Sequence, residues 1–454
     1  MPLTSHNPAT GQNLKTYLEI SDAELENKIA KSATAFESWR QTSFEERARI
    51  LLAAQAELTN HAEYYGKIIT TEMGKPITEA INESKKSGLN CEYYAKNGAD
   101  FLTPEKIASE YAESYLRFDP LGAILFVMPW NFPFWQVFRM AAPTLIAGNT
   151  ILLKHASNVP GCALACEKVW RKAGLPDGVF QTLLVGTDKV EKILRDDRVK
   201  GVSLTGSERA GSAVAKIAGA EIKPAVMELG GSDPFIVCAD ANLNLALNAA
   251  RATRLLNAGQ VCLAGKRFLV AEKIYDEFCA RLTKLFAEYK IGDPMNMDTQ
   301  MGPLVSERAR TEIDRQVKES IKLGAKILIG GSPLSGPGYF YPPTILSELT
   351  ANMPAWQEET FGPVAAIMKF STDDEAIKIA NDSRYGLSGA VFTASPERAQ
   401  KFISKLQVGG IYVNDFFKSD PRFPIGGTKK SGLGRELAKY GIRAFVNVKT
   451  VMVK

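Results

Sequence analysis

The 454-residue chain contains only three histidines, His6, His61 and His155. A Ser-His-Asp triad or a histidine-rich metal site would have to draw on these three, so the sequence argues against both. The six cysteines include no C-x-x-C pair, and six thiols are too few for a disulfide framework over this length. We therefore expect no metal site and a location in a reducing compartment, the cytoplasm.

Long uninterrupted apolar runs are also missing. The most apolar stretch, residues 121–148, is broken by three prolines, by Asn131 and by Arg139, which a bilayer would penalise heavily. We expect this stretch to form a buried strand, a turn and a helix. Residues 1–12 have neither the apolar core of a secretory signal nor the arginine-rich pattern of a transit peptide. We therefore expect no membrane partner and no targeting segment.

An excess of charge of one sign is missing as well. Lys+Arg 55 against Asp+Glu 50 gives a net charge of +5, which is small and unclustered over this length. A nucleic-acid partner is therefore not expected. Hydrophobic residues at 45% and charged residues at 23% are typical of a globular protein with a large core. At ~150 residues per domain, the length predicts about three domains.

Alternation of strands and helices is the main pattern that is present. Residues 21–102 have helical spacing and open with a capping-box pattern at Ser21–Glu24. Beyond Tyr115, short apolar runs alternate with helical segments, at 122–128, 150–154, 180–185 and 201–205. A second series follows Glu228. The pattern predicts βαβ units with parallel sheets in two α/β domains, with a seam near residues 227–231.

Three short motifs contain residues suited to catalysis. Cys262 follows a glycine-containing turn in LLNAGQVCLAG, where close approach of a substrate to a thiol is possible. Glu228 stands between an apolar run and Gly-Gly, so desolvation would raise its pKa toward that of a general base. Asn131, fixed between two prolines, suits an oxyanion-binding amide. The plainer alternatives are a buried cysteine, a loop carboxylate and a turn residue or helix cap.

Phosphate-binding signatures are incomplete. The chain has no G-x-x-x-x-G-K-[ST] motif, and no G-x-G-x-x-G follows a strand. Residues 206–211 follow the predicted strand 201–205 and begin a helix. A helix N-terminus in that position can receive a pyrophosphate, although the same residues also suit a simple helix cap.

Taken together, these segments resemble the aldehyde dehydrogenase superfamily over nearly the whole chain. The motifs, in the family's order, are PWNFP at 129–133, Lys154 at a strand end, TGS at 205–207, ELGG at 228–231, NAGQVC at 257–262, EETFGPV at 358–364 and GGTKKSGLGRE at 426–436. The resemblance implies that Cys262 attacks an aldehyde, that Asn131 and the Cys262 N–H hold the oxyanion, and that Glu228 activates the hydrolytic water. A CoA-acylating enzyme is disfavoured because Glu228 provides a base for hydrolysis.

The same resemblance implies a nicotinamide dinucleotide site. Its expected residues are Trp130, Lys154, Ser157, Thr205, Ser207, Leu229, Glu359 and Phe361. Members that prefer NAD usually carry Glu three residues after the family's lysine, where this chain has Ser157. A carboxylate ~4–5 Å from the 2′-phosphate of NADP would cost a few kcal/mol of binding free energy. Because position 157 has no carboxylate and Lys154 adds a positive charge, the 2′-phosphate is favoured. We expect NADP as the preferred cofactor, with NAD as a possible alternative.

Several departures from the common family pattern are similar to the shorter bacterial succinate-semialdehyde dehydrogenases. Arg139, in an otherwise apolar helical segment, needs an anionic partner, either a substrate carboxylate or an internal salt bridge. Ser419 is a candidate for a second contact to the substrate. Longer members of this group carry a second arginine where this chain has Leu256, and a second cysteine where it has Ala264. A disulfide switch beside Cys262 is therefore excluded.

The resemblance implies an α/β fold with a Rossmann-like cofactor domain, an α/β catalytic domain and a small β oligomerisation arm. The expected bounds are 1–111 with 122–228, then 229–420, and 112–121 with 421–454 for the arm and C-terminal segment. The arm would pair subunits into a homodimer or homotetramer. The expected reaction is oxidation of succinate semialdehyde. The alternatives are another short aldehyde, such as glutarate semialdehyde, and a catalytically silent scaffold on the same fold.

Overall fold

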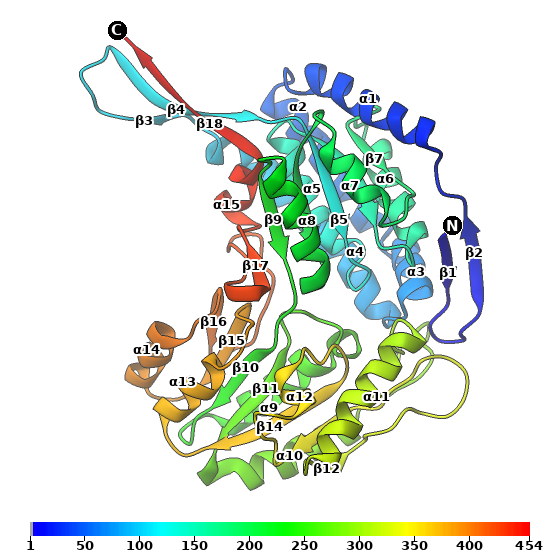
Figure 1. Ribbon diagram of the computed structural model, residues 1–454, viewed down its shortest axis with the longest axis vertical. Helices are drawn as coiled ribbons and strands as arrows, with labels where there is room; N and C mark the ends of the chain where they lie inside the picture. The colour runs from blue at the N-terminus through cyan, green and yellow to red at the C-terminus, as the bar shows by residue number, and fades with distance from the viewer. Residues whose placement is uncertain (1–2) are drawn as a thin grey trace.

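The computed structural model describes residues 3–454, which form two α/β halves, each built around its own sheet (Figure 1). The first sheet has the order β17-β9-β8-β5-β6-β7. Its strands are β5 (Ala123–Met128), β6 (Thr150–His155), β7 (Phe180–Thr182), β8 (Val199–Thr205), β9 (Ala225–Glu228) and β17 (Gly432–Leu433). All pairs are parallel except β17 with β9, so the strand–helix alternation predicted from the sequence is present.

Eight helices pack around this sheet or beside it. They are α1 (Asp22–Trp39), α2 (Phe44–Asn60), α3 (Ala62–Met73), α4 (Ile77–Phe101), α5 (Trp135–Ile146), α6 (Pro160–Lys172), α7 (Lys189–Arg195) and α8 (Glu208–Ala220). The capping box at the start of α1 is confirmed, since the Ser21 hydroxyl accepts from the Glu24 N–H and the Glu24 carboxylate accepts from the Ser21 N–H. Helix α5 is buried along its whole length, which explains its nearly continuous apolar sequence.

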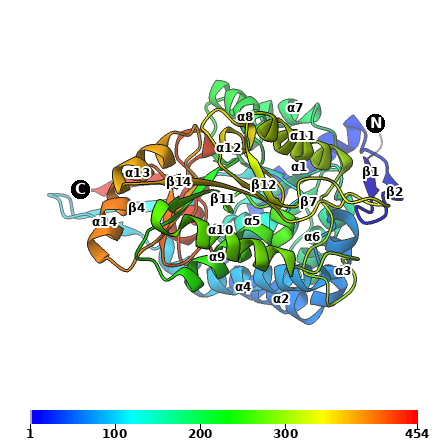
Figure 2. The same ribbon diagram turned by 90° about the horizontal axis from the view of Figure 1, so that it is seen from below.

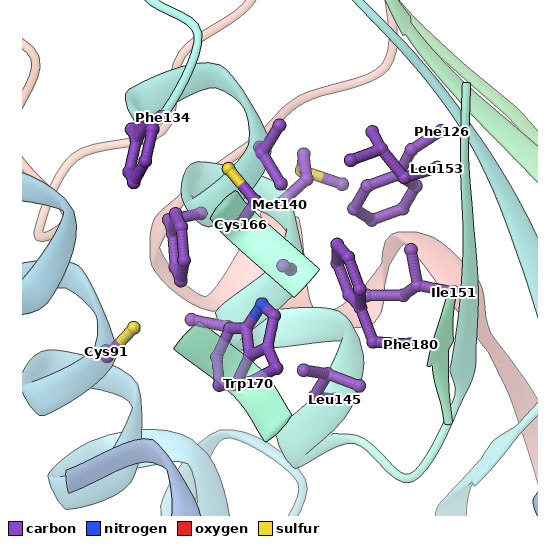
Figure 3. Close-up of a cluster of buried hydrophobic side chains, with 14 of the residues drawn as sticks. Cys91, Phe126, Phe134, Met140, Leu145, Ile151, Leu153, Cys166, Trp170 and Phe180 are labelled. Carbon is purple, nitrogen blue, oxygen red and sulfur yellow. The ribbon is translucent and has the colours of Figure 1, made fainter. Parts of the chain in front are cut away.

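The core of the first half lies between α5, α6 and the sheet. Figure 3 shows Phe134 and Met140 from the α5 region, Trp170 from α6 and Leu153 from β6 gathered into one cluster. The ring of Phe138 stacks on that of Trp170 with centroids 5.2 Å apart. Burying each such side chain contributes about 1.5–3 kcal/mol. This packing holds the N-terminus of α5 rigidly, and the candidate site is built there.

The second half contains a seven-stranded sheet of order β12-β13-β14-β11-β10-β15-β16. Its strands are β10 (Asp233–Val237), β11 (Gly265–Ala271), β12 (Lys326–Ile329), β13 (Thr344–Ser347), β14 (Val364–Phe370), β15 (Ser388–Phe392) and β16 (Gly410–Val413). Its helices are α9 (Leu243–Leu255), α10 (Tyr275–Ala287), α11 (Glu307–Lys322), α12 (Pro354–Gln357), α13 (Asp373–Asn381) and α14 (Pro396–Lys405). Residues 229–232 connect the two sheets directly, from the end of β9 to the start of β10.

A three-stranded arm projects from one end of the molecule, opposite an N-terminal hairpin (Figures 1 and 2). The arm consists of β3 (Glu105–Lys106), β4 (Glu113–Pro120) and β18 (Val446–Val453), and the hairpin of β1 (Leu3–His6) and β2 (Asn13–Tyr17). The C-terminal strand has a partner within its own chain, since β18 pairs antiparallel with β4. The short helix α15 (Ala438–Ile442) links β17 to the arm. Among residues 3–454, no helix is both long and apolar enough to cross a membrane.

Candidate active site

Cys262 stands at the end of a strained turn that follows α9. Asn257 and Ala258 both have φ near +51°, and Gly259 has φ of +75°. A Cβ on Gly259 would lie 2.2 Å from the Gly362 carbonyl oxygen, so only glycine fits there. A strained turn of this kind persists only when its surroundings hold it, and such turns are typical of functional sites.

The turn is held by Asn131, which precedes α5. The Asn131 Nδ2 donates to the Gln260 carbonyl at 2.9 Å, and the Asn257 Nδ2 donates to the Asn131 carbonyl at 2.8 Å. From α4, the Glu79 carboxylate accepts the Asn257 N–H at 3.0 Å. Because an amide nitrogen carries two hydrogens, Asn131 retains one for an oxyanion. The structure thus places Asn131 in direct contact with the turn that carries Cys262.

Two cavities meet at Cys262. The first has a volume of about 280 Å³, and the second about 210 Å³. Both are lined by Gln136 and by the half-buried Cys262. A thiol between two cavities can contact a different molecule in each. This arrangement is the central geometric feature of the site.

The first cavity brings together most of the residues expected to bind a dinucleotide. Those that line it are Trp130, Thr205, Ser207, Leu229, Glu359 and Phe361. The Trp130 and Phe361 rings meet edge to face with centroids 5.7 Å apart. Ser207 caps α8, its hydroxyl accepting the Ala210 N–H at 3.3 Å, so the N-terminus of this helix faces the cavity. An apolar slot beside a helix N-terminus suits an aromatic ring joined to a pyrophosphate.

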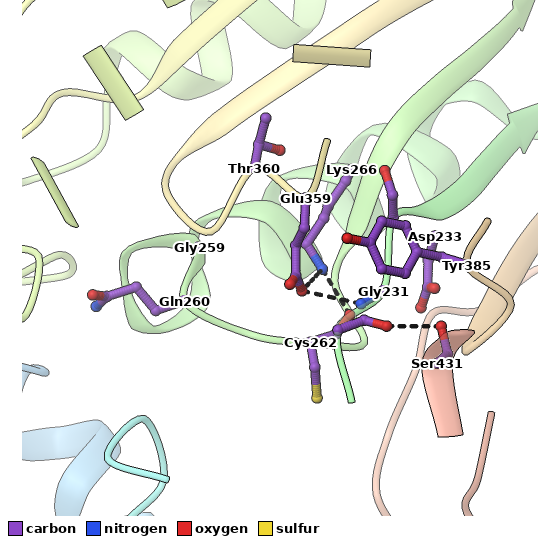
Figure 4. A network of polar contacts seen from close by, with 12 residues as sticks. Gly231, Asp233, Gly259, Gln260, Cys262, Lys266, Glu359, Thr360, Tyr385 and Ser431 are labelled. Atoms are coloured by element: carbon purple, nitrogen blue, oxygen red, sulfur yellow. Dashed lines mark hydrogen bonds and ion pairs between the residues drawn. The ribbon is translucent and has the colours of Figure 1, made fainter. Parts of the chain in front are cut away.

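A buried network connects Cys262 with Glu359 (Figure 4). The Lys266 ammonium donates to the Cys262 carbonyl at 2.7 Å and lies 3.3 Å from the Glu359 carboxylate, which also accepts the Gly231 N–H at 3.1 Å. The Cys262 sulfur points away from this network. Burial raises the pKa of the thiol to about 12, while Lys266 and Arg139 act in the opposite direction. Lys266 therefore favours the thiolate, and the sequence motifs did not identify it.

Glu228 lies at the end of β9 and is 3% exposed. Burial raises the pKa of its carboxyl to about 8, the nearby Glu436 carboxylate adds to the rise, and Arg139 opposes it. Glu228 is not among the described residues that line the two cavities. The Glu228 carboxylate nevertheless lies close enough to Cys262 to help raise the pKa of that thiol. The elevated pKa that the sequence predicted for this carboxyl has the expected cause, desolvation.

Arg139 is 2% exposed and forms a salt bridge with the fully buried Glu436. Its Nη2 also donates to the Thr205 hydroxyl at 3.2 Å. The internal salt bridge that the sequence left open is thus present, and Arg139 still lines the second cavity. The pKa of Glu436 is raised, because burial outweighs the stabilisation by Arg139 and Ser203. Much of the charge of Arg139 is therefore balanced inside the protein.

Lys154 and Ser157 lie beyond the first cavity, at the end of β6. Lys154 is 4% exposed, and burial lowers the pKa of its ammonium, while Asp188 and Glu19 act in the opposite direction. Ser157 is exposed three residues later. The structure thus places a buried cation at the end of β6 and an exposed hydroxyl three residues later, and neither residue lines the first cavity.

The second cavity is lined by apolar side chains and by three cations. Its lining residues are Lys86, Phe132, Trp135, Gln136, Arg139, Thr253, Leu256, Val261, Cys262, Leu263, Phe416, Phe417, Lys418 and Ser419. Three of these are cations, and none of the described lining residues is a carboxylate. The Ser419 hydroxyl is buried without a hydrogen-bond partner in the part of the chain that the structure describes. Arg254, two residues before Leu256, does not line this cavity and donates instead to the Gly259 and Gly265 carbonyls.

A thiol and an amide donor stand where the two cavities meet, and a buried carboxyl of raised pKa lies near the thiol. Such a set of groups is typical of the class of enzymes that oxidise aldehydes through a covalent intermediate. The chain belongs to the aldehyde dehydrogenase family, whose model matches residues 2–451. The resemblance drawn from the motifs is thereby confirmed. The fold class, with its Rossmann-like cofactor domain, is confirmed as well.

Individual relatives are similar along their whole length. The chain is 45% identical over 453 residues to the probable succinate-semialdehyde dehydrogenase, NADP(+), of Synechocystis sp., covering 100% of both. It is 45% identical over 458 residues to succinate-semialdehyde dehydrogenase 1, NADP(+), of Mycobacterium bovis, again covering 100% of both. The structure of succinic semialdehyde dehydrogenase from Streptococcus pyogenes in complex with NADP+ superposes with a TM-score of 0.97 at 38% identity, covering 99% of each chain.

Proposed function

We propose that this chain oxidises succinate semialdehyde to succinate with NADP. The observation that carries the proposal is the position of Cys262 between a cavity lined by six residues expected to bind a dinucleotide and a cavity lined by three cations and no described carboxylate. An aldehyde that carries a carboxylate fits the second cavity both by its charge and by its short apolar chain. The relatives described above, which are named as NADP-dependent succinate-semialdehyde dehydrogenases or contain NADP+, support the same substrate and cofactor.

The chain's own residues supply the covalent chemistry. The Cys262 thiolate, favoured by Lys266, attacks the aldehyde carbon, and the resulting oxyanion accepts hydrogen bonds from Asn131 and the Cys262 N–H. A nicotinamide ring held beside Cys262 in the first cavity would supply the acceptor for the hydride that leaves that carbon. The carbon is then a thioester on Cys262. Glu228 removes a proton from water, which attacks the thioester, releases the carboxylate product and returns the thiol.

The residues of the first cavity fit a nicotinamide dinucleotide. A Cβ on Gly230 would lie 2.4 Å from the Glu359 carboxylate, so the glycine keeps this carboxylate close to the backbone beside the cavity. Glu359 would hold the nicotinamide ribose, and Ser207 with the α8 N-terminus would hold the pyrophosphate. Lys154 and Ser157 would face the 2′-phosphate of NADP. NAD would be accepted less well, because it lacks the phosphate that Lys154 attracts.

Arg139 and Ser419 are proposed to donate hydrogen bonds to the substrate carboxylate. Both line the second cavity, and the Ser419 hydroxyl lacks an internal partner among residues 3–454. Because Arg139 is also bound to Glu436, its guanidinium is held in a fixed orientation. An oriented donor of this kind favours a carboxylate over a neutral methyl group.

We also propose that the enzyme is a homodimer or homotetramer in the cytoplasm. The arm exposes apolar side chains on β18, including Val448 and Met452, which a second subunit would cover. A reducing compartment suits the mechanism, because Cys262 must remain a free thiol, and all six cysteines are free in the structure.

Steady-state kinetics test the proposal. NADPH or NADH formation should be measured with succinate semialdehyde, glutarate semialdehyde and butanal, each with NADP and with NAD. The expected result is the highest kcat/KM for succinate semialdehyde with NADP. A higher value with glutarate semialdehyde would show that the preferred substrate has a longer carbon chain. A higher value with NAD would refute the cofactor preference, and no turnover with any aldehyde would refute the activity.

A further inference from the structure

Lys86 on α4 is a cation of the second cavity that no sequence motif identified. Its ammonium lies 4.3 Å from the centroid of the Trp135 ring, and both side chains line the cavity. No salt bridge or hydrogen bond joins the Lys86 side chain to any of residues 3–454 of the protein. The cation–π contact fixes the position of the ammonium but leaves its three hydrogens available.

The acidic groups near Lys86 are already engaged elsewhere. Glu83, one turn earlier on α4, forms a salt bridge with the buried Lys75 and accepts the Phe134 and Trp135 N–H groups at 2.8 and 3.0 Å. Asp420, in the loop that follows β16, accepts four hydrogen bonds from Arg422, three of them from its guanidinium. Neither carboxylate therefore pairs directly with Lys86.

The remaining charged groups near Lys86 are cations. Burial lowers the pKa of the Lys86 ammonium to about 8, Arg139 and Lys75 lower it further, and Glu83 and Asp420 act in the opposite direction. A desolvated ammonium with cationic neighbours gains stability when an anion enters its cavity. Lys86 is still mostly protonated at pH 7, because that pH is about one unit below its pKa.

The other two cations of the cavity differ from Lys86. Arg139 already forms a salt bridge with Glu436. Lys418 is paired with Asp415 at 2.8 Å, and its side chain is 63% exposed, so water screens its charge. Lys86 is thus the cation of this cavity whose charge is both partly desolvated and unmatched by a carboxylate of the described chain.

We propose that Lys86 binds the carboxylate of the aldehyde substrate through a charge-assisted hydrogen bond and so selects anionic over neutral aldehydes. This inference rests on the proposed function, and it adds a specificity-determining residue to it. Arg139 and Ser419 orient the substrate carboxylate, while Lys86 neutralises it.

The test compares Lys86→Gln, Lys86→Arg and wild type with NADP, using succinate semialdehyde and butanal. Lys86→Gln should raise KM for succinate semialdehyde about 10- to 100-fold, the effect of losing one charged hydrogen bond. Its kcat, and both constants for butanal, should change less than about 3-fold. Lys86→Arg should recover most of the loss. The neighbouring Lys85, which is exposed, supplies the control Lys85→Gln with unchanged kinetics.

Each outcome separates the inference from the function on which it rests. If wild type prefers succinate semialdehyde and Lys86→Gln keeps the same preference, the role of Lys86 is wrong and the proposed function stands. If wild type shows no preference over butanal, both are wrong. Should Lys86→Gln fold poorly, inhibition of butanal oxidation by succinate is measured in wild type and Lys86→Arg as the pH rises through 8. The inhibition should weaken with pH in wild type and persist in Lys86→Arg, and identical pH profiles would overturn the inference.

Discussion

The carboxyl of Glu228 has to lose a proton before it can activate water. Burial, with the Glu436 carboxylate nearby, raises its pKa to about 8, so only about a tenth of the molecules have the basic form at pH 7. Where hydrolysis of the thioester limits turnover, kcat should therefore rise about tenfold from pH 7 to above pH 8 and then level off. The pH profile of kcat measures this.

Glu228→Gln provides the matched comparison, since it keeps the shape and removes the basic group. This variant should give one rapid burst of NADPH and then a steady rate lowered by about 10²–10⁴-fold, without the pH-dependent rise. A steady rate close to that of wild type would show that another group activates the water.

Ser157 is the residue that should set the preference between cofactors. Ser157→Glu places a carboxylate where the 2′-phosphate of NADP is expected, and the repulsion should cost a few kcal/mol. We expect kcat/KM with NADP to fall about 100-fold and that with NAD to rise or stay constant. Ser157→Ala, which adds no charge, is the control and should change either value less than about 3-fold. Equal losses with both cofactors in Ser157→Glu would contradict the assignment.

Among the elements, the start of α5 depends on a buried ion pair between Glu83 of α4 and Lys75, which precedes α4. Glu83 accepts the N–H groups of Phe134 and Trp135, and the Lys75 side chain has no exposed surface. Glu83→Gln can keep an oxygen acceptor but leaves the buried ammonium unpaired, which should lower the free energy of unfolding by about 3–5 kcal/mol. Urea denaturation measures this.

The exposed pair Glu92–Lys96 on the same helix provides the control. Glu92→Gln should change the free energy of unfolding by about 0.5 kcal/mol or less, because water screens surface pairs. If both variants lost the same stability, the buried pair would not be what anchors α5.

The elements that the sequence predicted well are those whose signals are local. The α1 capping box, the buried α5 and the parallel strands of both sheets follow from periodicity and caps that neighbouring residues supply. Cys262 and Asn131 became candidates because their turns contain glycine or proline and because both stand in motifs that resemble those of the family. Lys86, Lys266 and Glu436 could not be found in this way, because nothing near each of them in the sequence shows which distant side chains it meets. Their proposed roles depend on folding, which places α4 with Lys86, β11 with Lys266 and the C-terminal segment with Glu436 near α5.

At the scale of the whole molecule, the predicted dimer or tetramer depends on the arm. Val448 and Met452 lie on one face of β18 and are 53% and 59% exposed. Val448→Asp with Met452→Asp should convert the proposed dimer or tetramer to smaller species, because charges replace apolar contact area. Sedimentation velocity measures the change. Leu18→Asp, at a site 82% exposed and far from the arm, should leave the mass unaltered. A wild-type monomer would contradict the proposed assembly.

The proposed reaction requires an anionic aldehyde to become a thioester of Cys262 between the two cavities. Glu228→Gln, incubated with NADP and succinate semialdehyde and quenched in acid, should accumulate that thioester because its hydrolysis is slowed. Peptide mass spectrometry should then find a succinyl group on Cys262, absent when NADP is omitted and absent in Cys262→Ala. An unmodified Cys262 in a sample that still forms NADPH would contradict the covalent mechanism.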